Sequence, residues 1–177
     1  TSTGVISGSP TVVQGQTTYT VTATYNNTTT TAQVRITITA PTLAYSGSPF
    51  LFISGNAITS LSPTVSAAPN GYTVSPSLPA GLSINATTGV ISGTPLTAAT
   101  AANYTITANF GGSVTAQSTV NIGVSAPNLS YAGSPFSFNQ NTSITPASPT
   151  VTGAPESYSA LLPIGLSVDP AMGIISV

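Results

Sequence analysis

Residues 78–95 read LPAGLSINATTGVISGTP, and this stretch decides the fold. Gly81 can adopt a backbone conformation that is closed to other residues, and Leu82 and Ile84 follow it at positions that face a core. Residues 85–89 have the composition of a tight turn, because Asn bonds its own backbone and Gly accepts a positive φ. The stretch therefore predicts a β-hairpin, and none of its residues is of a type that carries chemistry.

Parts of this stretch return elsewhere in the chain. LPIGLS and MGIIS lie within residues 162–176, and TGVISGSP occupies residues 3–10. Residues 43–73 align with residues 129–159 at an offset of 86, whereas TGVISGSP aligns with TGVISGTP at an offset of 85. Such self-similarity is typical of tandem repeats. We expect the C-terminal part of a repeat in residues 1–40, a complete repeat in residues 41–127 and the N-terminal part of a repeat in residues 128–177, with Ala40-Pro41 and Ala126-Pro127 at the joints.

Turn signals divide the complete repeat into six or seven short strands. This spacing is typical of a β-sandwich of immunoglobulin type. The expected strands cover residues 50–53, 64–65, 72–75, 82–84, 90–92, 104–110 and 114–124.

The last two of these strands show the clearest alternation. Tyr104, Ile106, Ala108 and Phe110 face one way, and the intervening polar residues face the other. Residues 19–25 repeat this pattern in the first partial copy. The pairs Gly111-Gly112 and Asn26-Asn27 tolerate positive φ and predict two-residue hairpin turns. We expect these hairpins to form one edge of a sheet.

The composition favours a folded all-β protein. Thr (31) and Ser (25) make up about a third of the chain and alternate with β-branched residues, which favours strands over helices. Mean hydropathy is +0.34 and net charge is −1, unlike a disordered chain. No stretch approaches the roughly 18 apolar residues of a spanning helix, so no membrane insertion is expected. The predicted fold class is tandem immunoglobulin-like β-sandwiches, one complete repeat flanked by two partial ones.

Three residues carry formal charge: Arg35, Glu156 and Asp169. The chain has no His, Cys, Lys or Trp, so the usual groups of acid–base, nucleophilic and soft-metal chemistry are missing, and we expect no enzyme activity, metal or cofactor. One cation cannot neutralise a run of phosphates, which excludes nucleic acid. We interpret the three charges as solvated surface positions. The Tyr and Phe residues fall mostly at inward positions, which favours core packing over a sugar-stacking platform.

The motifs LPAGLS and TGVISGTP, followed by a strand of the YTVTA type, resemble an immunoglobulin-like repeat found many times over in large bacterial secreted and surface proteins. The resemblance covers nearly the whole chain. It implies an immunoglobulin-like fold and a location outside the cell or on its surface, where such repeats serve as spacers, adhesive stalks and appendage material. It supplies no catalytic residue. The scarcity of charge departs from the usual composition of these repeats.

Six asparagines stand in Asn-x-Ser/Thr sequons and are candidate glycosylation sites. About 3.5 sequons would arise by chance from this composition, so the excess is slight. Glycans would solubilise a surface that lacks charge repulsion. The six residues are Asn26, Asn27, Asn85, Asn103, Asn128 and Asn141.

The two partial repeats are complementary, since residues 1–40 contain late strands and residues 128–177 contain early strands. Each would expose a sheet edge and half a core, so one chain could complete the next by strand complementation. The TGxIS strand occurs in both pieces, which fits an excerpt of a longer array. The partners we expect are copies of the chain or adjacent repeats, with glycans or a neighbouring cell surface as further candidates.

We interpret the chain as a structural repeat segment of an extracellular bacterial fibre, filament or surface stalk. Two alternatives stay open. An adhesin or carbohydrate-binding module would cluster outward-facing aromatic residues. A spacer in a large secreted hydrolase would have its catalytic domain outside this sequence.

Overall fold

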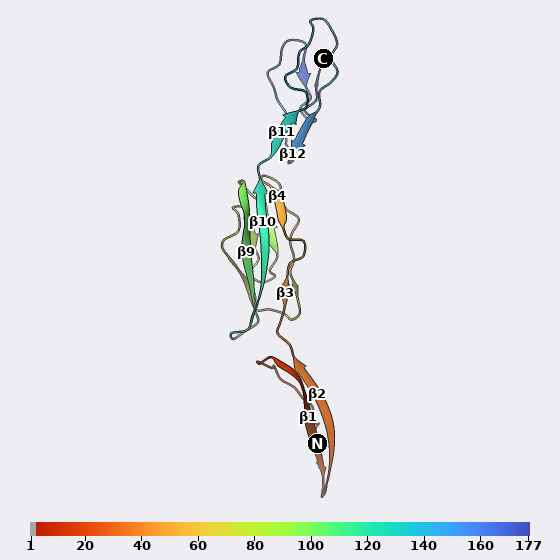
Figure 1. The fold of residues 1–177 in the computed structure, drawn as a ribbon, viewed down its shortest axis with the longest axis vertical. Helices are drawn as coiled ribbons and strands as arrows, with labels where there is room; N and C mark the ends of the chain where they lie inside the picture. Colours follow the sequence, from red (N-terminus) through yellow and green to blue (C-terminus); the bar gives the residue numbers. More distant parts are fainter. Residues whose placement is uncertain (1–2) are drawn as a thin grey trace.

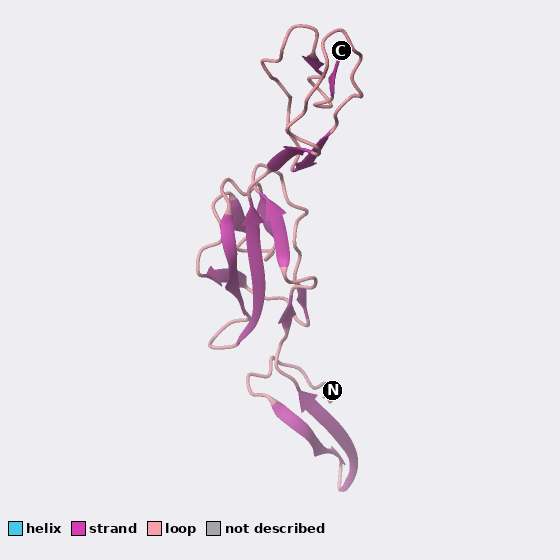
Figure 2. Cartoon of the chain, turned by 45° about the horizontal axis from the view of Figure 1, so that its top comes forward, coloured by secondary structure: helices cyan, strands magenta, loops and turns pink. Residues whose placement is uncertain are grey.

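The computed structural model describes residues 3–177, which form an extended series of β-structures (Figure 1). A long hairpin lies at one end, a sandwich in the middle and a looser group of short strands at the other end (Figure 2). All regular elements in this range are strands, which confirms the all-β fold class. Within residues 3–177, no helix is long and apolar enough to span a membrane.

The central sandwich is built on a four-stranded sheet with the order β4-β10-β9-β6. It consists of β4 (Phe50–Ile53), β6 (Gly71–Ser75), β9 (Ala99–Asn109) and β10 (Thr115–Ser125). The two long strands β9 and β10 pair antiparallel, β4 pairs parallel with β10, and β6 pairs antiparallel with β9.

This order corrects one prediction, because the β9–β10 hairpin lies in the middle of its sheet and not at an edge. The physical reason is that two earlier strands return to pair with the free side of each hairpin strand. Their pairing satisfies backbone groups that an edge would expose.

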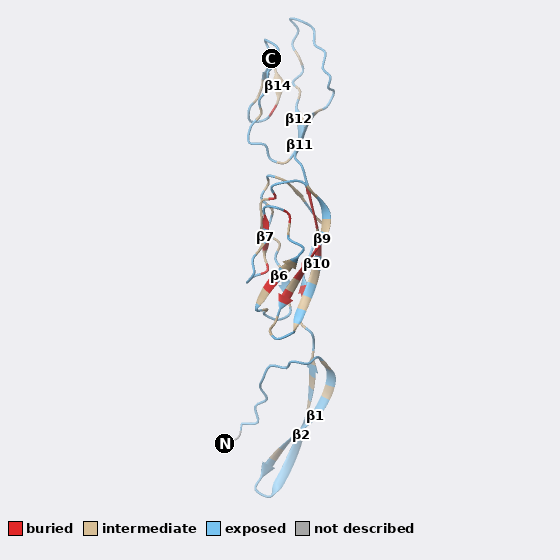
Figure 3. Cartoon of the chain, turned by 90° about the vertical axis from the view of Figure 1, so that its left-hand side faces the viewer, coloured by how far each residue is buried: buried red, intermediate tan, exposed pale blue. Residues whose placement is uncertain are grey.

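Two small ladders form the opposite layer of the sandwich. One joins β3 (Leu43–Ala44) to β5 (Thr64–Val65), and the other joins β7 (Leu82–Ile84) to β8 (Ile91–Gly93). The core lies between these ladders and the sheet, and Figure 3 shows its buried residues in red. Within the described chain, the buried hydrophobic residues all fall in this sandwich: Leu43, Tyr45, Tyr72, Leu82, Ile91, Tyr104, Ile106, Ala108, Val120, Ile122 and Val124.

The quoted stretch 78–95 forms the expected hairpin around β7 and β8. The side-chain oxygen of Asn85 accepts hydrogen bonds from the backbone N–H groups of Thr87 and Thr88, both at 2.9 Å. Gly81 has a φ of +91°, and a Cβ added there would lie 1.9 Å from the carbonyl oxygen of Thr94. The glycine therefore permits both the turn and the close approach of the chain that leaves β8.

The hairpin at the start of the chain pairs β1 (Gln14–Tyr25) with β2 (Thr28–Ile38). Its turn has the two predicted residues, with Asn26 at a φ of 46°. The two-residue turn predicted for β9–β10 is wrong, because the Phe110 N–H donates to the carbonyl oxygen of Val114 at 2.9 Å and this bond closes a loop of three residues, 111–113. The additional residue explains why the repeat offset changes from 85 to 86 across this hairpin.

The end of the chain contains four short strands in two ladders. β11 (Asn128–Tyr131) pairs with β12 (Pro149–Thr152), and β13 (Ser167–Val168) pairs with β14 (Ile175–Ser176). Long loops join the two ladders (Figure 2). No large sheet covers them in the described chain, so they lie open to solvent.

Candidate functional site

The central sandwich shows how a core of this type is closed. The inward side chains of β9 and β10 cover the two ladders of the opposite layer, and Ile106, Val120 and Ile122 are 0% exposed. The tyrosines Tyr45 and Tyr72 are buried beneath them. The hairpin therefore provides one complete side of the core.

The β1–β2 hairpin reproduces this covering element. Tyr19 pairs with Val34, as Tyr104 pairs with Val120. Both hairpins also shift their pairing register at the same place. The shift lies between Gln14 and Thr17 in β1 and between the equivalent Ala99 and Ala102 in β9. The inward face of the first hairpin covers no core within residues 3–177, and its residues Tyr19, Val21 and Tyr25 are 40%, 38% and 62% exposed.

The C-terminal part reproduces the opposite layer. Leu129 pairs with Val151 as Leu43 pairs with Val65, and Val168 pairs with Ile175 as Ile84 pairs with Ile91. The isolated bridge between Ala147 and Ile175 matches the bridge between Leu61 and Ile91. The Tyr131 hydroxyl donates to the carbonyl oxygen of Gly173 at 2.5 Å, as the Tyr45 hydroxyl donates to that of Gly89.

Two segments of the C-terminal part stay unpaired. Residues 136–139 correspond to β4, and residues 157–161 correspond to β6. In the central sandwich, β4 and β6 pair with the two strands of the hairpin. Among the described residues, no such hairpin pairs with the C-terminal part, and neither segment forms a strand.

Side chains of the C-terminal part are less buried than their counterparts in the central sandwich. Leu129 is 53% exposed, whereas its central counterpart Leu43 is 7% exposed. Phe136 and Phe138 stack on each other with ring centroids 5.8 Å apart, yet they are 40% and 45% exposed. The core of the C-terminal part is therefore half built and open.

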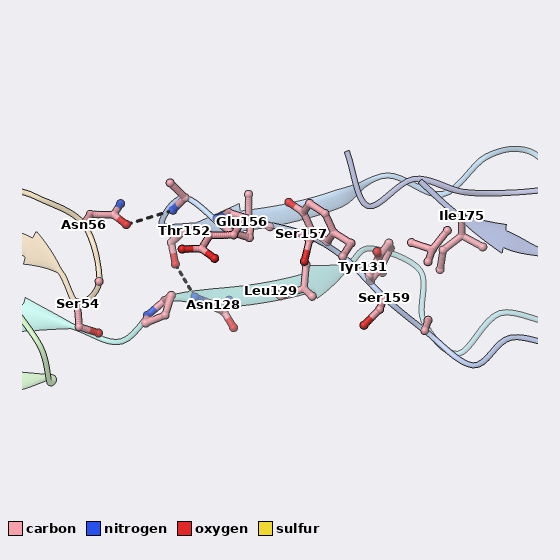
Figure 4. A pocket seen from close by; sticks show the side chains of 18 residues that line it. Ser54, Asn56, Asn128, Leu129, Tyr131, Thr152, Glu156, Ser157, Ser159 and Ile175 are labelled. Carbon is pink, nitrogen blue, oxygen red and sulfur yellow. Dashed lines mark hydrogen bonds between the residues drawn. The ribbon is translucent and has the colours of Figure 1, made fainter. Parts of the chain in front are cut away.

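A cleft of about 640 Å³ occupies this open core (Figure 4). Its walls include Leu129, Tyr131, Tyr158 and Ile175, which correspond to buried core residues of the central sandwich. One end reaches the central sandwich, where the Asn56 side-chain oxygen accepts a hydrogen bond from the Ala154 N–H at 3.3 Å. The cleft is thus the vacant half of an immunoglobulin-like core.

Charge contributes little to this site. Glu156 is the one charged residue that lines the cleft, and it is exposed. Arg35 is exposed on β2, as predicted. Asp169 differs from the prediction, because it is half-buried and its Oδ1 accepts bonds from the N–H groups of Ala171 and Met172, both at 2.8 Å. It performs the turn-closing role that Asn85 performs in the central repeat.

Titration and metal chemistry give no further site. Burial raises the pKa of the Tyr45 hydroxyl, and Tyr72 adds to the rise. The raised pKa keeps Tyr45 neutral and hydrogen-bonded in the core. Among residues 3–177, the structure brings no three His, Cys, Asp or Glu residues together.

The structure disperses the six candidate glycosylation sites. Asn26 and Asn27 form the tip of the first hairpin, and Asn141 lies in a loop with a φ of 61°. The side chain of Asn103 accepts a hydrogen bond from Asn121. All six side chains are exposed: Asn26, Asn27, Asn85, Asn103, Asn128 and Asn141.

Residues 35–125 match the He_PIG family, whose description is "Putative Ig domain". The chain belongs to this family. The matched He_PIG residues contain every strand of the central sandwich, from β3 to β10. They confirm the immunoglobulin-like repeat expected from the sequence motifs.

The three solved structures named below are longer than the He_PIG chain, which spans less than two thirds of each of them. A comparison with curated proteins gives no match. The similar structures include mouse cadherin-23 EC22-24 (16% identity, 92% of this chain, 64% of that chain, TM-score 0.38), the eight N-terminal Ig domains of DSCAM isoform 1.30.30 (10%, 82%, 24%, 0.42) and the human desmocollin-1 ectodomain (16%, 83%, 36%, 0.34).

Sequence reasoning missed two parts of the site. It did not predict β3 or β11, which lie just after the two Ala-Pro joints. It also missed the contact of Asn56 with Ala154. The alignment of Leu43 with Leu129 was the signal that could have revealed both short strands.

Proposed function

We propose that this chain is a structural segment of an extracellular bacterial fibre, filament or surface stalk, in which immunoglobulin-like domains join end to end by strand complementation. One observation carries the proposal: the two ends of the chain hold the two complementary layers of the sandwich that is complete in the middle. Complementary layers of one sandwich on either side of a complete sandwich suit linkage in series, to adjacent repeats or to further copies.

The proposed domain borders are residues 1–40, 41–127 and 128–177. The second joint, Ala126-Pro127, is supported by direct contacts between the parts that it connects. Besides the Asn56–Ala154 bond, a Cβ at Gly153 would lie 3.1 Å from Pro127 and 3.4 Å from Ile53. These contacts place the start of the C-terminal part against the end of the central sandwich.

The location outside the cell is part of the proposal and is supported by the family resemblance of the motifs. The six exposed sequons agree with such a location, and glycans there would keep a charge-poor surface soluble. The cleft in the C-terminal part is better explained as an unfilled core than as a sugar site, since its aromatic residues match buried tyrosines of the central repeat.

Small-angle scattering of the purified 177-residue chain tests the proposal. The expected result is an elongated particle at low concentration, with a cross-section of one sandwich, and rods in electron micrographs at high concentration. A compact particle would contradict the proposal. A glycan array gives the second readout, because strong and selective binding would favour the adhesin alternative instead.

A further inference from the structure

We propose that the outward face of the central four-stranded sheet is a side-by-side contact between two copies of this chain, centred on Leu51. This inference goes beyond the proposed function, because it concerns the flank of the sandwich and is independent of how domains are joined in series. The centre of the contact is a shallow hollow of about 420 Å³, lined by residues of β4, β9 and β10.

Leu51 is the feature of this face that the fold does not explain. Its neighbours Phe50 and Phe52 pack against the core, so Leu51 points to the outer face, where it is 74% exposed. A Cβ added at Gly123 would lie 3.1 Å from Leu51 Cδ2 and 3.2 Å from the Cβ of Ala101. The leucine therefore leans over bare backbone of β10. The sandwich gains little from this side chain, since most of it stays in water.

The other copies of the repeat show that the framework does not require an apolar hollow. The β1–β2 and β9–β10 hairpins shift register at the same place, so the hollow lies at a β-bulge, a feature that re-aims side chains. The repeat offsets give polar counterparts at its three central positions. The counterparts of Leu51, Ala101 and Gly123 are Ser137, Gln16 and Thr37. An exposed apolar patch that belongs to one copy of a shared framework indicates an interaction site.

The polar remainder of the face can be covered at low cost, because its amide groups already bond within the face. The Asn121 side-chain N–H donates to Asn103 Oδ1 at 2.8 Å, and the Gln117 side-chain N–H donates to the Thr107 hydroxyl at 3.2 Å. Polar groups that are paired within one surface lose less than unpaired groups do when water is removed from it.

Charge identifies a second copy as the partner. Residues 41–127 contain no Arg, Lys, His, Asp or Glu, so two such faces meet without repulsion and without burying a charge. A charged partner would leave its own ionic groups desolvated and unpaired against this face. Depletion of charged residues is also typical of the core of protein interfaces. The face therefore suits a neutral surface of its own kind.

A two-fold axis through the hollow makes the contact self-complementary. Each Leu51 then enters the hollow of the other copy, beside Gly123 and Ala101, and the two leucines lie next to each other. Such an isologous contact closes as a pair and does not grow further.

The size of the face sets the strength of this pair. The eleven-residue strands β9 and β10, with the shorter β4 and β6, give the face an area of about 500 Å². An interface of standard size buries roughly 800 Å² on each partner, so a single pair binds weakly. In the proposed fibre, contacts of this kind between parallel fibres add by avidity.

Sedimentation velocity of the full chain at increasing concentration tests the contact. All chains carry Val21→Asp, which puts a carboxylate at the counterpart of the buried Ile106 and suppresses association by strand complementation. This parent chain should form a weak dimer. Leu51→Lys should weaken the dimer at least about 10-fold, which corresponds to about 1.4 kcal/mol, because each pair would then hold two ammonium groups side by side.

Leu96→Lys is the matched control. Leu96 is 69% exposed, and its side chain lies against Gly81 of the opposite layer, outside the hollow. The substitution changes the net charge by the same amount and should leave the dimer unchanged. Circular dichroism should give the same melting temperature of the central sandwich for all these chains, because both leucines are mostly in water.

Charge pairing distinguishes the two-fold contact from any other contact made by Leu51. Leu51→Asp alone should also weaken the dimer. An equimolar mixture of the Leu51→Lys and Leu51→Asp chains should form a mixed dimer, because the two-fold axis places an ammonium group beside a carboxylate.

Three results would overturn the inference: no concentration-dependent dimer of the parent chain, equal weakening by Leu51→Lys and Leu96→Lys, or no mixed dimer from the oppositely charged chains. None of them bears on the elongated shape that scattering measures, so the proposed stalk function would stand if this contact failed. A compact particle would refute the stalk function and leave the dimer measurements unaffected.

Discussion

Replacement of Ile106 tests the central core, because this side chain is fully buried in the middle of the four-stranded sheet. Ile106→Ala removes three carbons and leaves a cavity, which costs about 2–5 kcal/mol in comparable cores. A domain of this size loses roughly 4–8 °C of melting temperature per kcal/mol. We therefore expect the melting temperature to fall on the order of 10–30 °C.

The matched control is the neighbouring Thr107, whose hydroxyl accepts a bond from Gln117 at 3.2 Å on the outer face. Thr107→Asp should cost no more than about 1 kcal/mol. Ile106→Asp should leave no folded sandwich, since the carboxylate would enter the core without a partner.

Differential scanning calorimetry of the full chain, at a concentration low enough to prevent association, measures these differences. Loss of the far-ultraviolet β-type signal should accompany each transition. Equal losses for Ile106→Ala and Thr107→Asp would refute the assignment of inward and outward faces on β9.

Four other predictions concern the same sandwich. Gly81→Ala should lower the melting temperature of the sandwich by more than about 10 °C, because the added Cβ clashes with the Thr94 backbone. Gly165→Ala has a similar φ but open space around it, and it should leave the melting temperature of the sandwich unchanged. Stability should fall above about pH 10, because the unfolded chain then releases the Tyr45 proton while the raised pKa retains it in the fold; Tyr45→Phe should flatten this fall in urea titrations. EDTA or calcium should leave the melting temperature of the sandwich unchanged, because the described residues bring no three His, Cys, Asp or Glu side chains together. Residues 42–127 alone should give a cooperative melt, and a disordered product would contradict the proposed borders.

Much of the fold could be predicted because the decisive signals are local. Alternation along residues 104–108 predicted which side chains enter the core, and their burial confirms it. The turn at Asn85 was predictable because its side chain bonds the next few backbone groups. Sheet order was not predictable in this way, since the pairing of β4 with β10 joins segments about 70 residues apart.

The candidate site was predicted only in outline. Repeat counting indicated that both ends hold incomplete domains, but it could not tell which edges lack partners. Which strand edges lack partners depends on where the hairpin lies in the sheet, and the repeat pattern does not show its position. Asp169 shows a similar limit, since its charge suggested a solvated position, whereas its alignment with Asn85 explains the observed turn contacts.

Disulfide cross-linking between two copies tests the central claim most directly, because the natural sequence has no Cys. Thr73 lies opposite Thr107 in the central sheet, so strand complementation should place Thr22 of one copy opposite Ser159 of another. Thr30 lies on β2, which β1 would separate from Ser159 in this strand order, and it provides the control. A disulfide requires Cα atoms roughly 4.4–6.8 Å apart, so cross-linking reports the register.

The measurement mixes a Thr22→Cys chain with a Ser159→Cys chain under mild oxidation and follows the products on a non-reducing gel. The account predicts a mixed covalent dimer from this pair, and little product when Thr30→Cys replaces Thr22→Cys. Equal yields from the two pairs, or no mixed dimer from either, would contradict it.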